Sequence, residues 1–369
     1  RDMSVPARCM VTGGSGLVGQ RLSEMLVERG AQRVVSFDKA PKPHLSSNDP
    51  RIQWMQGDIA NLDDCLKACE GIDCVFHIAA IVGPFHPLPL YKKVNYEGTL
   101  NLIEACRRHK VRKFVNSGTP STRMHGGDLA GVSEEEMVMP KKGKYLAAYA
   151  ETKAMAEVAL NEACCDSFMV VTVAPHQVYG PRDSLFLPNL MNAARTNKLR
   201  VFGSGKNIID LTYVDNYCHG LIISEKQLFP GSKCLGKFYV VTDGEPQNNW
   251  ATLDRAAQSM GYKSLYSRSG IPTWLLMGIG YLIEMIATVL SSVGLVERWK
   301  VLNALKINPF TVRMMTIHRY FDISGAKRDL GYKPLYTFEQ GWAKTMEWFK
   351  KEWAPLHRTT EEIRSLGWS

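Results

Sequence analysis

The sequence predicts an α/β fold with a doubly wound parallel sheet and a smaller C-terminal region. Over the first 180 residues, short β-branched runs alternate with segments of helical periodicity, which is the pattern of βαβ units. A glycine-rich turn also joins the first run to the first helical segment. Because 369 residues suffice for two domains, we expect a first domain over residues 1–182 and a second over residues 183–369.

The expected strands and helices alternate along the chain. Strands are expected at residues 8–12, 33–37, 52–56, 74–77, 113–116 and 168–173, and helices at residues 17–29, 62–68, 96–109 and 147–162. Residues 238–242 are predicted as a later strand that returns to the sheet. An amphipathic helix is expected near residues 338–353.

Composition excludes several classes of protein. Hydrophobic residues make up 45% of the chain without a low-complexity tract, which excludes intrinsic disorder. Only one long apolar stretch occurs, so a polytopic membrane protein is excluded. Nine scattered cysteines without a CxxC pair indicate a reducing compartment, and no leader pattern predicts secretion. The net charge of +9 suits nucleic acid, anionic lipid or an acidic small molecule, but no basic–aromatic interleaving supports nucleic acid. The nine histidines show no metal-ligand spacing, so no metal is expected.

The glycine-rich turn has the spacing of a dinucleotide-binding, Rossmann-type turn. Gly13 permits a tight turn, Gly16 lets the backbone approach a pyrophosphate, and Gly19 allows close helix–strand packing. The first helix begins at Leu17 and Val18, whose free N–H groups are expected to face the phosphates. A glycine-rich turn without a ligand is the alternative.

An acidic residue at the end of the second strand supports the dinucleotide interpretation. Asp38 lies 19 residues beyond Gly19 and is placed to accept both ribose hydroxyls. A carboxylate there repels a 2′-phosphate, so NAD is predicted rather than NADP. Arg33 and Lys39 lie close enough in sequence to leave NADP open.

Tyr149 and Lys153 lie one helical turn apart on the same helix face. A free phenol has a pKa of about 10, and a cation within about 4–6 Å lowers it. Such a tyrosine can take the proton of a substrate hydroxyl while hydride leaves its carbon. The pair alone is common on solvated helix faces, but behind a dinucleotide turn it predicts a catalytic acid/base.

The motifs together resemble a known family. They are the glycine-rich turn, Asp58 after Gly57, His77-Ile-Ala-Ala80, Val94-Asn95-Tyr-Glu-Gly98-Thr99-Leu-Asn101, the Tyr149/Lys153 pair and Pro175-His-Gln-Val-Tyr-Gly180-Pro181. In this order they resemble the extended short-chain dehydrogenases/reductases. Second-half motifs, including Tyr213-Val-Asp-Asn216 and Leu330-Gly-Tyr-Lys-Pro334, resemble the 3β-hydroxysteroid dehydrogenase branch, and within it the decarboxylating sterol-4α-carboxylate 3-dehydrogenases.

The resemblance implies further cofactor contacts. Asp58 and Ile59 would flank the adenine, and Ala79 and Ala80 would line the pyrophosphate and ribose. Lys153 would hold the nicotinamide ribose. The C-terminal region would bind the substrate.

The carboxamide contact and the third catalytic position also follow from the resemblance. The backbone from Pro175 to Gln177 would meet the carboxamide. Counting along the fifth strand places Thr119 where the family has a hydroxyl that orients the substrate oxygen; Ser117 is the alternative, and a plain strand-end turn is a third interpretation. The chain departs from the family at Ala174, where an arginine is usual, and in a charged segment over residues 123–144.

The apolar segment at residues 271–296 contains one charge, Glu284. Its length permits a membrane span, but glycines, Pro272 and the carboxylate disfavour one. Residues 297–321 carry a net charge of +4, which suits a helix that lies in an anionic membrane interface. A helix buried over the substrate pocket is the alternative.

These observations predict NAD-dependent oxidation of a 3β-hydroxyl on a sterol or steroid, with loss of a 4α-carboxylate where one is present. Two rivals remain: a nucleotide-sugar epimerase or dehydratase, for which Arg182 is a candidate diphosphate ligand, and a non-catalytic NAD-binding scaffold. We expect the cytosolic face of an intracellular membrane, the endoplasmic reticulum in a eukaryote, and a homodimer is compatible with the resemblance.

Overall fold

The largest layer of the protein is a parallel sheet of seven strands. The computed structural model describes residues 5–83, 85–196, 198–357 and 366. The strands lie in the order β11-β7-β5-β4-β1-β2-β3. They are β1 (Arg8–Thr12), β2 (Arg33–Asp38), β3 (Ile52–Gln56), β4 (Cys74–His77), β5 (Lys113–Ser117), β7 (Met169–Pro175) and β11 (Phe238–Val241). The predicted α/β class is confirmed, and each predicted strand is present to within two residues at either end.

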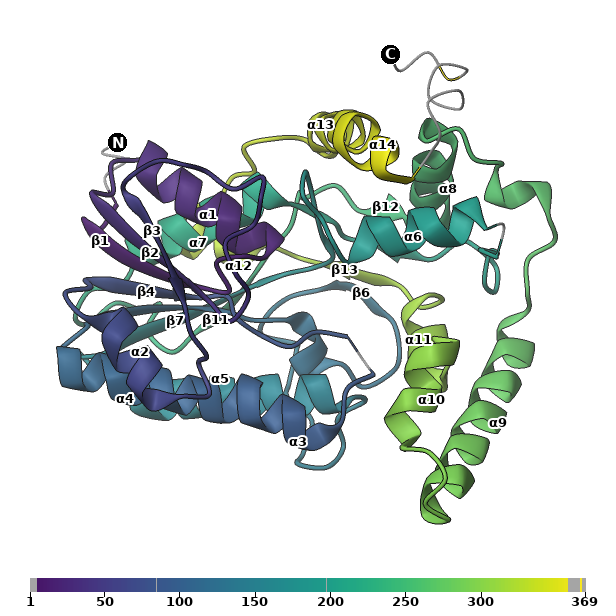
Figure 1. Cartoon of the computed structure of the whole chain (residues 1–369), viewed down its shortest axis with the longest axis horizontal. Coiled ribbons are helices and arrows are strands. Elements are labelled where there is room, and N and C mark those ends of the chain that lie inside the picture. Colours follow the sequence, from purple (N-terminus) through teal and green to yellow (C-terminus); the bar gives the residue numbers. More distant parts are fainter. Residues whose placement is uncertain (1–4, 84, 197, 358–365, 367–369) are drawn as a thin grey trace.

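Helices cover both faces of this sheet (Figure 1). One face carries α1 (Leu17–Glu28) and α7 (Val214–Glu225), which pack against each other. The other carries α2 (Leu62–Cys69), α4 (Gly98–His109) and α5 (Ala148–Ala163). Each face therefore has its own apolar core, because the strands are buried on both sides.

The segment before α4 differs from the prediction. A helix was expected from residue 96, but α3 (Leu88–Tyr91) runs into a π-helical turn at Lys92–Glu97 before α4 begins at Gly98. Asn95 is buried in this turn, and its amide bonds both the N–H and the carbonyl oxygen of Ile81. Periodicity alone does not reveal such a tertiary contact.

Two smaller sheets lie beyond the carboxyl ends of the main strands. Four strands in the order β12-β9-β13-β6 form one, and β10 and β8 form the other. Their bounds are β6 (Leu129–Val132), β8 (Val178–Tyr179), β9 (Ile208–Ile209), β10 (Thr212–Tyr213), β12 (Gln247–Asn248) and β13 (Arg319–Phe321). Because β6 precedes residue 182 yet pairs with β13, the chain crosses between the two regions more than once. The predicted boundary near residue 182 stays a prediction.

The remaining helices belong to the C-terminal region. They are α6 (Phe186–Arg195), α8 (Asn249–Ser259), α9 (Thr273–Ser292), α10 (Arg298–Leu305), α11 (Pro309–Met314), α12 (Ser324–Asp329), α13 (Phe338–Trp348) and α14 (Ala354–His357). The predicted helix at 338–353 consists of α13 and a π-helical turn at Phe349–Trp353.

Helix α9 lies at the edge of the molecule beside α10 and α11, away from the seven-stranded sheet (Figure 1). Its buried residues are Leu276, Gly280 and Ala287, whereas Trp274 is 74% exposed. Among the described residues it is the one helix whose length and composition would allow it to cross a membrane. The expectation of a helix buried over a pocket is therefore wrong for most of α9.

Candidate active site

At Gly13 and Gly19 of the glycine-rich turn, neighbouring backbone atoms leave no room for a side chain. Gly13 has a φ of +71°, and a Cβ atom there would lie 2.9 Å from the Ala79 backbone. A Cβ atom at Gly19 would lie 2.1 Å from the Gly13 carbonyl oxygen. At Gly16 a Cβ atom would meet only that oxygen, at 3.4 Å. Gly16 therefore faces open space, as the approach of a ligand to the backbone requires.

The N-terminus of α1 fits an anionic ligand. Gly16 is its N-cap, no side chain caps it, and its first turn holds no acidic residue. The N–H groups of Leu17 and Val18 have no partner within the helix, because the first turn has no preceding carbonyl groups. Together with the helix dipole, this arrangement favours a phosphate group.

Asp38 ends β2 beside this turn. Its carboxylate accepts hydrogen bonds from the N–H groups of Ser15 and Ala40, both at 2.9 Å. Lys39 forms an ion pair with Asp58 at 2.8 Å instead of pointing to an open phosphate site. Arg33 likewise hydrogen-bonds Gln53 and the Glu70 carbonyl oxygen. Both cations that left NADP open thus have protein partners.

The other predicted cofactor contacts lie at the carboxyl ends of β3 and β4. Ile59 is buried, and a Cβ atom at Gly98 would lie 2.8 Å from its Cγ1. The Ala79 N–H donates to the Thr12 hydroxyl at 3.1 Å, whereas Ala80 is half-buried. The predicted residues Asp58, Ile59, Ala79 and Ala80 therefore follow two strands of the same sheet edge.

His77 has a structural role in this region. Its ring is hydrogen-bonded between the hydroxyls of Thr12 and Thr99, at 2.8 and 3.0 Å. Burial and the nearby Lys153 cation lower the pKa of His77 to about 3. The ring is therefore neutral at physiological pH and serves to hold β1, β4 and α4 together.

The catalytic triad candidates meet at the carboxyl end of β5. Tyr149 lies in the first turn of α5, and the Thr119 hydroxyl acts to lower the pKa of its phenol. The Ser117 hydroxyl instead bonds the phenol of Tyr217 at 2.7 Å. One turn beyond Tyr149, Lys153 is buried, and its Nζ donates to the Ser117 carbonyl oxygen at 2.8 Å. Of the two candidate hydroxyls, the one that faces Tyr149 is therefore Thr119.

Burial governs the protonation of this pair. It raises the pKa of Tyr149 to about 12, opposed by the Thr119 hydrogen bond and reinforced by the Tyr91 phenol. It lowers the pKa of Lys153 to about 8, which the Glu157 carboxylate opposes. The pKa of the Tyr149 phenol is thus above its ordinary value, whereas the sequence predicted that the Lys153 cation would lower it. A pKa below the ordinary value requires positive charge in addition to that of Lys153.

Three residues near the pair were not assigned a role from sequence. The Tyr217 phenol bonds Ser117 and the Val173 carbonyl oxygen, which turns the serine away from Tyr149. The Tyr91 ring lies 6.3 Å from the Tyr149 ring, edge to face. Asn95, which ties the loop after β4 in place, also reaches the Thr152 hydroxyl at 3.4 Å. Only Asn95 had a sequence signal, because it lies inside one of the recognised motifs.

The segment after β7 carries the predicted carboxamide contact. Pro175 ends β7, and Gln177 has a φ of +41°, which is uncommon for a residue other than glycine. Between them, His176 is buried and bonds the Asp210 carbonyl oxygen at 2.6 Å. Arg182, the candidate diphosphate ligand, forms a bidentate ion pair with Glu24 of α1 at 2.7 and 2.8 Å. That ion pair weakens the nucleotide-sugar alternative.

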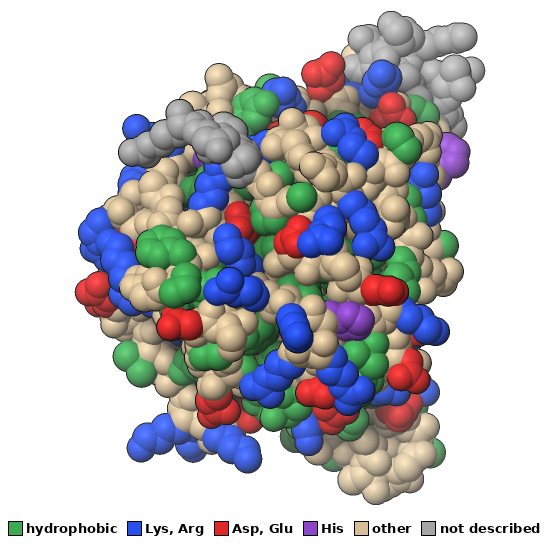
Figure 2. All heavy atoms as spheres, turned by 90° about the vertical axis from the view of Figure 1, so that its left-hand side faces the viewer, with side chains coloured by type: hydrophobic (Ala, Val, Ile, Leu, Met, Phe, Trp, Pro, Cys, Tyr) green, Lys and Arg blue, Asp and Glu red, His purple; other side chains and the backbone are tan. Residues whose placement is uncertain are grey.

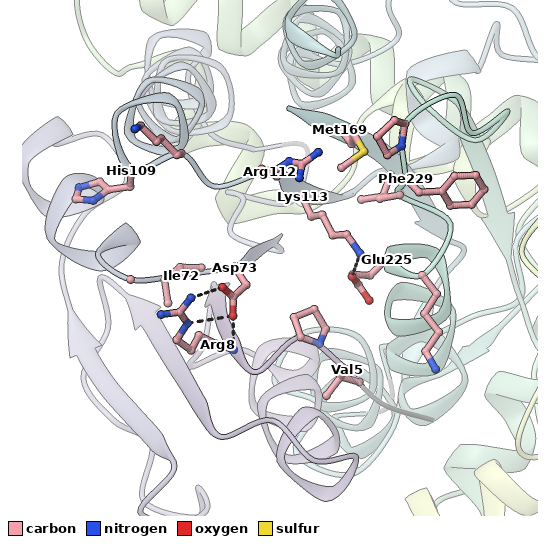
Figure 3. Close-up of a pocket in the computed structure, with 16 residues that line it drawn as sticks. Val5, Arg8, Ile72, Asp73, His109, Arg112, Lys113, Met169, Glu225 and Phe229 are labelled. Atoms are coloured by element: carbon pink, nitrogen blue, oxygen red, sulfur yellow. Dashed lines mark hydrogen bonds and ion pairs between the residues drawn. The ribbon is translucent and has the colours of Figure 1, made fainter. Parts of the chain in front are cut away.

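A cavity of about 910 Å³ lies at the opposite edge of the sheet (Figure 3). Its lining includes the amino ends of β1, β5 and β7, with the ion pairs of Arg8 with Asp73 and Lys113 with Glu225. Parallel α/β sheets bind ligands at the carboxyl ends of their strands. This cavity is therefore separate from the candidate active site.

Comparison with known proteins agrees with this geometry. The chain is 30% identical over 351 residues to mouse sterol-4-alpha-carboxylate 3-dehydrogenase, decarboxylating, covering 94% of the chain and 92% of the relative. It is 31% identical to 2-alkyl-3-oxoalkanoate reductase of Stenotrophomonas maltophilia, covering 90% of the chain and 97% of the relative. Among solved structures, dTDP-glucose 4,6-dehydratase DesIV of Streptomyces venezuelae, with NAD and TYD bound, superposes with a TM-score of 0.71 at 19% identity, covering 95% of the chain and all of that structure.

The family follows from the extent of these matches. The model of the 3-beta hydroxysteroid dehydrogenase/isomerase family matches residues 10–267, which include the glycine-rich turn, the Tyr149/Lys153 pair and the segment after β7. The chain belongs to the 3-beta hydroxysteroid dehydrogenase/isomerase family of oxidoreductases.

Proposed function

We propose that the protein oxidises a 3β-hydroxyl group of a sterol or steroid with NAD. The observation that carries the proposal is the placement of Tyr149 and the buried Lys153 one turn apart on α5, with the Lys153 Nζ bonded to the carbonyl oxygen of Ser117 at the carboxyl end of β5. The pair lies at the same edge of the sheet as the glycine-rich turn. The open face of Gly16 and the uncapped start of α1 fit a dinucleotide pyrophosphate, and Asp38 is placed for the adenine ribose.

The side chains divide the work of the reaction. NAD, when bound, accepts the hydride and brings positive charge to the site. Thr119 orients the substrate oxygen, and the Tyr149 phenolate takes the hydroxyl proton. Lys153 holds the nicotinamide ribose and, with the added positive charge, opposes the rise that burial causes in the Tyr149 pKa.

We also propose that the substrate carries a carboxylate on the carbon next to the one that is oxidised. Both relatives described above are named for such compounds: a sterol 4α-carboxylate with a reacting C3, and a 3-oxoalkanoate. Oxidation of the C3 hydroxyl makes a β-keto acid. Its bond to the carboxyl carbon breaks, the electron pair forms an enolate, carbon dioxide leaves, and the enolate takes a proton. The protein need only supply the oxidation.

The test uses two substrates and one variant. A 4α-carboxysterol with NAD should yield NADH and carbon dioxide in equal amounts, and a 3β-hydroxysteroid without the carboxylate should yield NADH alone. Tyr149→Phe should lower the rate at least a thousandfold and leave NADH binding unchanged. Absence of NADH with both substrates would overturn the steroid assignment. Unchanged biological activity of Tyr149→Phe would favour a non-catalytic scaffold.

We further propose that α9 and α10 dock on a membrane surface. Apolar side chains cover the outer face of α9, where Leu282 is 51% and Met285 58% exposed. The one charge within the helix, Glu284, is paired with Arg298 of α10 at 3.3 Å, which reduces the cost of bringing it to an interface. At the end of α10, Lys306 lies 5.1 Å from the Phe85 ring, in the loop that leads to α3.

The surface formed by α9 and α10 carries little unpaired positive charge. Lys300 is paired with Glu297 at 2.6 Å, and Arg319 is not on the surface of these helices. Figure 2 shows that Lys and Arg side chains are also spread over the face on the left of Figure 1. Apolar insertion, rather than charge alone, must therefore supply most of the affinity. Docking through α9 would bring the substrate site close to the lipid from which a sterol would come. We accordingly propose that the protein lies on the cytosolic face of an intracellular membrane.

Vesicle binding tests the proposal. Half-exposed Leu282 and Met285 would each gain about 1 kcal/mol on insertion, so L282N/M285N should weaken binding to phosphatidylserine-containing vesicles about thirtyfold. Val158 of α5 is 42% exposed on another helix, so Val158→Asn should bind as the wild type does. Equal binding of both variants in sedimentation would contradict membrane docking through α9.

A further inference from the structure

The guanidinium of Arg319 has no counter-ion among the residues that the structure describes. Arg319 begins β13, and its Nη2 donates to the Met314 carbonyl oxygen at 2.6 Å. Its Nη1 lies 3.1 Å from His176 Nε2, and its Nε is buried without a hydrogen-bond partner. Among the described residues no carboxylate forms an ion pair with it, and burial lowers the pKa of Arg319 to about 10.

Three other enclosed arginines of the chain are neutralised. Arg21 pairs with Asp215, Arg123 with Glu157 and Arg182 with Glu24. Taking a charge out of water without a partner costs several kcal/mol. His176 does not compensate Arg319, because burial and the guanidinium lower the pKa of His176 to about 3 and keep the ring neutral. Within the described part of the chain, the positive charge of Arg319 is therefore not neutralised by a carboxylate.

The topology places this charge beside the carboxyl end of β7, the neighbour of the strand that leads to Thr119. His176, its hydrogen-bond partner, immediately follows the carboxyl end of β7. β7 pairs with β5, so that Val173 lies opposite Ser117, two residues before Thr119. Arg319 itself is paired with Leu129 of β6 and Ile209 of β9, in the sheet beyond that edge.

We propose that Arg319 is a specificity-determining residue that binds a carboxylate of the substrate. The proposal rests on the oxidoreductase function proposed above and names the group that the site recognises. A guanidinium offers five N–H donors in a planar fork that matches a carboxylate. His176 and the Met314 carbonyl oxygen hold two of its nitrogens, which fixes the plane, and the buried Nε–H has no acceptor among the described residues. The bound oxyanion supplies the missing negative charge.

Kinetics with paired substrates test this role. Arg319→Gln and Arg319→Lys should raise KM for a 4α-carboxysterol about tenfold to a hundredfold. Their KM for the 3β-hydroxysteroid without the carboxylate should change less than threefold. Arg313→Gln, a change to a half-buried arginine in neighbouring α11, is the matched control and should leave both values unchanged. Equal changes for both substrates would overturn the proposal and leave Arg319 a structural role.

A binding experiment separates this proposal from the proposed function. With NADH present, the 4α-carboxysterol should raise the unfolding temperature of the wild type but not of Arg319→Gln, whether or not turnover occurs. If NADH production fails while this Arg319-dependent shift persists, the reaction is wrong and the anion site stands. If a UDP-sugar gives the Arg319-dependent shift and the carboxysterol does not, the oxyanion is a phosphate and the carboxylate assignment is overturned. No Arg319-dependent shift with either ligand also overturns it.

Discussion

Two glycines in the turn before α1 should differ in what their substitution by alanine impairs. We expect Gly19→Ala to lower stability and Gly16→Ala to weaken cofactor binding. In Gly19→Ala, the new methyl group would lie 2.1 Å from the Gly13 carbonyl oxygen and 2.7 Å from its carbonyl carbon. Both neighbours are backbone atoms, so the turn itself must move. In Gly16→Ala, the methyl group would meet the same oxygen at 3.4 Å, and the φ of −77° suits alanine.

The structure sets the size of each effect. Overpacking costs about 1–3 kcal/mol, and a clash with rigid backbone places Gly19→Ala near the upper value of about 3 kcal/mol. With an unfolding entropy of about 2.1 cal/mol/K per residue, the 369 residues give about 0.8 kcal/mol/K, so its Tm should fall by about 4 °C. Gly16→Ala should change Tm by less than about 1 °C, since surface substitutions usually stay within about 0.5 kcal/mol. It should nevertheless weaken NADH binding at least tenfold, because the methyl group occupies the face that the pyrophosphate approaches.

Two measurements on the same variants decide the matter. Calorimetry gives Tm without ligand, and nicotinamide fluorescence gives the NADH Kd. Wild-type NADH affinity in Gly16→Ala would refute the assignment of that face to the pyrophosphate. A wild-type Tm in Gly19→Ala would refute the packing argument, whatever the cofactor affinity.

Three further predictions concern the catalytic pair and its support. Thr119→Ala should lower kcat at least a hundredfold, whereas Ser117→Ala should lower it less than tenfold, as steady-state kinetics would show; the reverse order would contradict the hydroxyl assignment. Lys153→Met should be inactive yet more stable at pH 7, because the wild type carries a buried cation whose pKa falls from 10.5 to about 8. Above pH 8 the folded wild type loses the Lys153 proton before the unfolded chain does, so the stability of the wild type rises with pH. The variant should therefore be more stable than the wild type by at most about 3 kcal/mol. Calorimetry should show this difference vanishing near pH 10.5. Arg123→Met should lower the free energy of unfolding by about 3–5 kcal/mol in denaturant titrations, because Glu157, bonded to Arg123 at 3.0 Å, is left buried and unpaired. The double variant R123M/E157M should recover most of this loss. A double variant as unstable as the single one would contradict this explanation.

Local patterns were sufficient to predict the sheet and the glycine-rich turn. β1 and β4 begin and end where the sequence predicts, because strands buried on both faces carry largely apolar sequence. The turn could be predicted because its geometry depends mainly on residues 13–19, which also contact the ends of β2 and β4. The π-helical turn before α4 was not predictable, since a side-chain contact between Asn95 and Ile81 leaves no mark on the periodicity of the segment.

The choice between two hydroxyls shows a second limit of local sequence. Ser117 and Thr119 are separated by one residue, and both can donate a hydrogen bond. The difference arises from Tyr217, 100 residues away in sequence, whose phenol engages the Ser117 hydroxyl. Three-dimensional packing thus decides which hydroxyl is free to face Tyr149.

Charge is the property for which position in the fold changed the interpretation most. By sequence, Arg319 belongs to a basic stretch behind an apolar helix and contributes to a membrane-facing flank. In the fold it belongs to β13, where it is half-buried, its Nε is buried without a partner, and no carboxylate of the described residues pairs with it. An exposed arginine in a flank contributes about 1 kcal/mol to lipid attraction, whereas a buried one without a partner costs several kcal/mol unless a ligand supplies the anion. The same residue therefore argues for the substrate rather than for the membrane, and the membrane contact of α9 must depend on its apolar side chains.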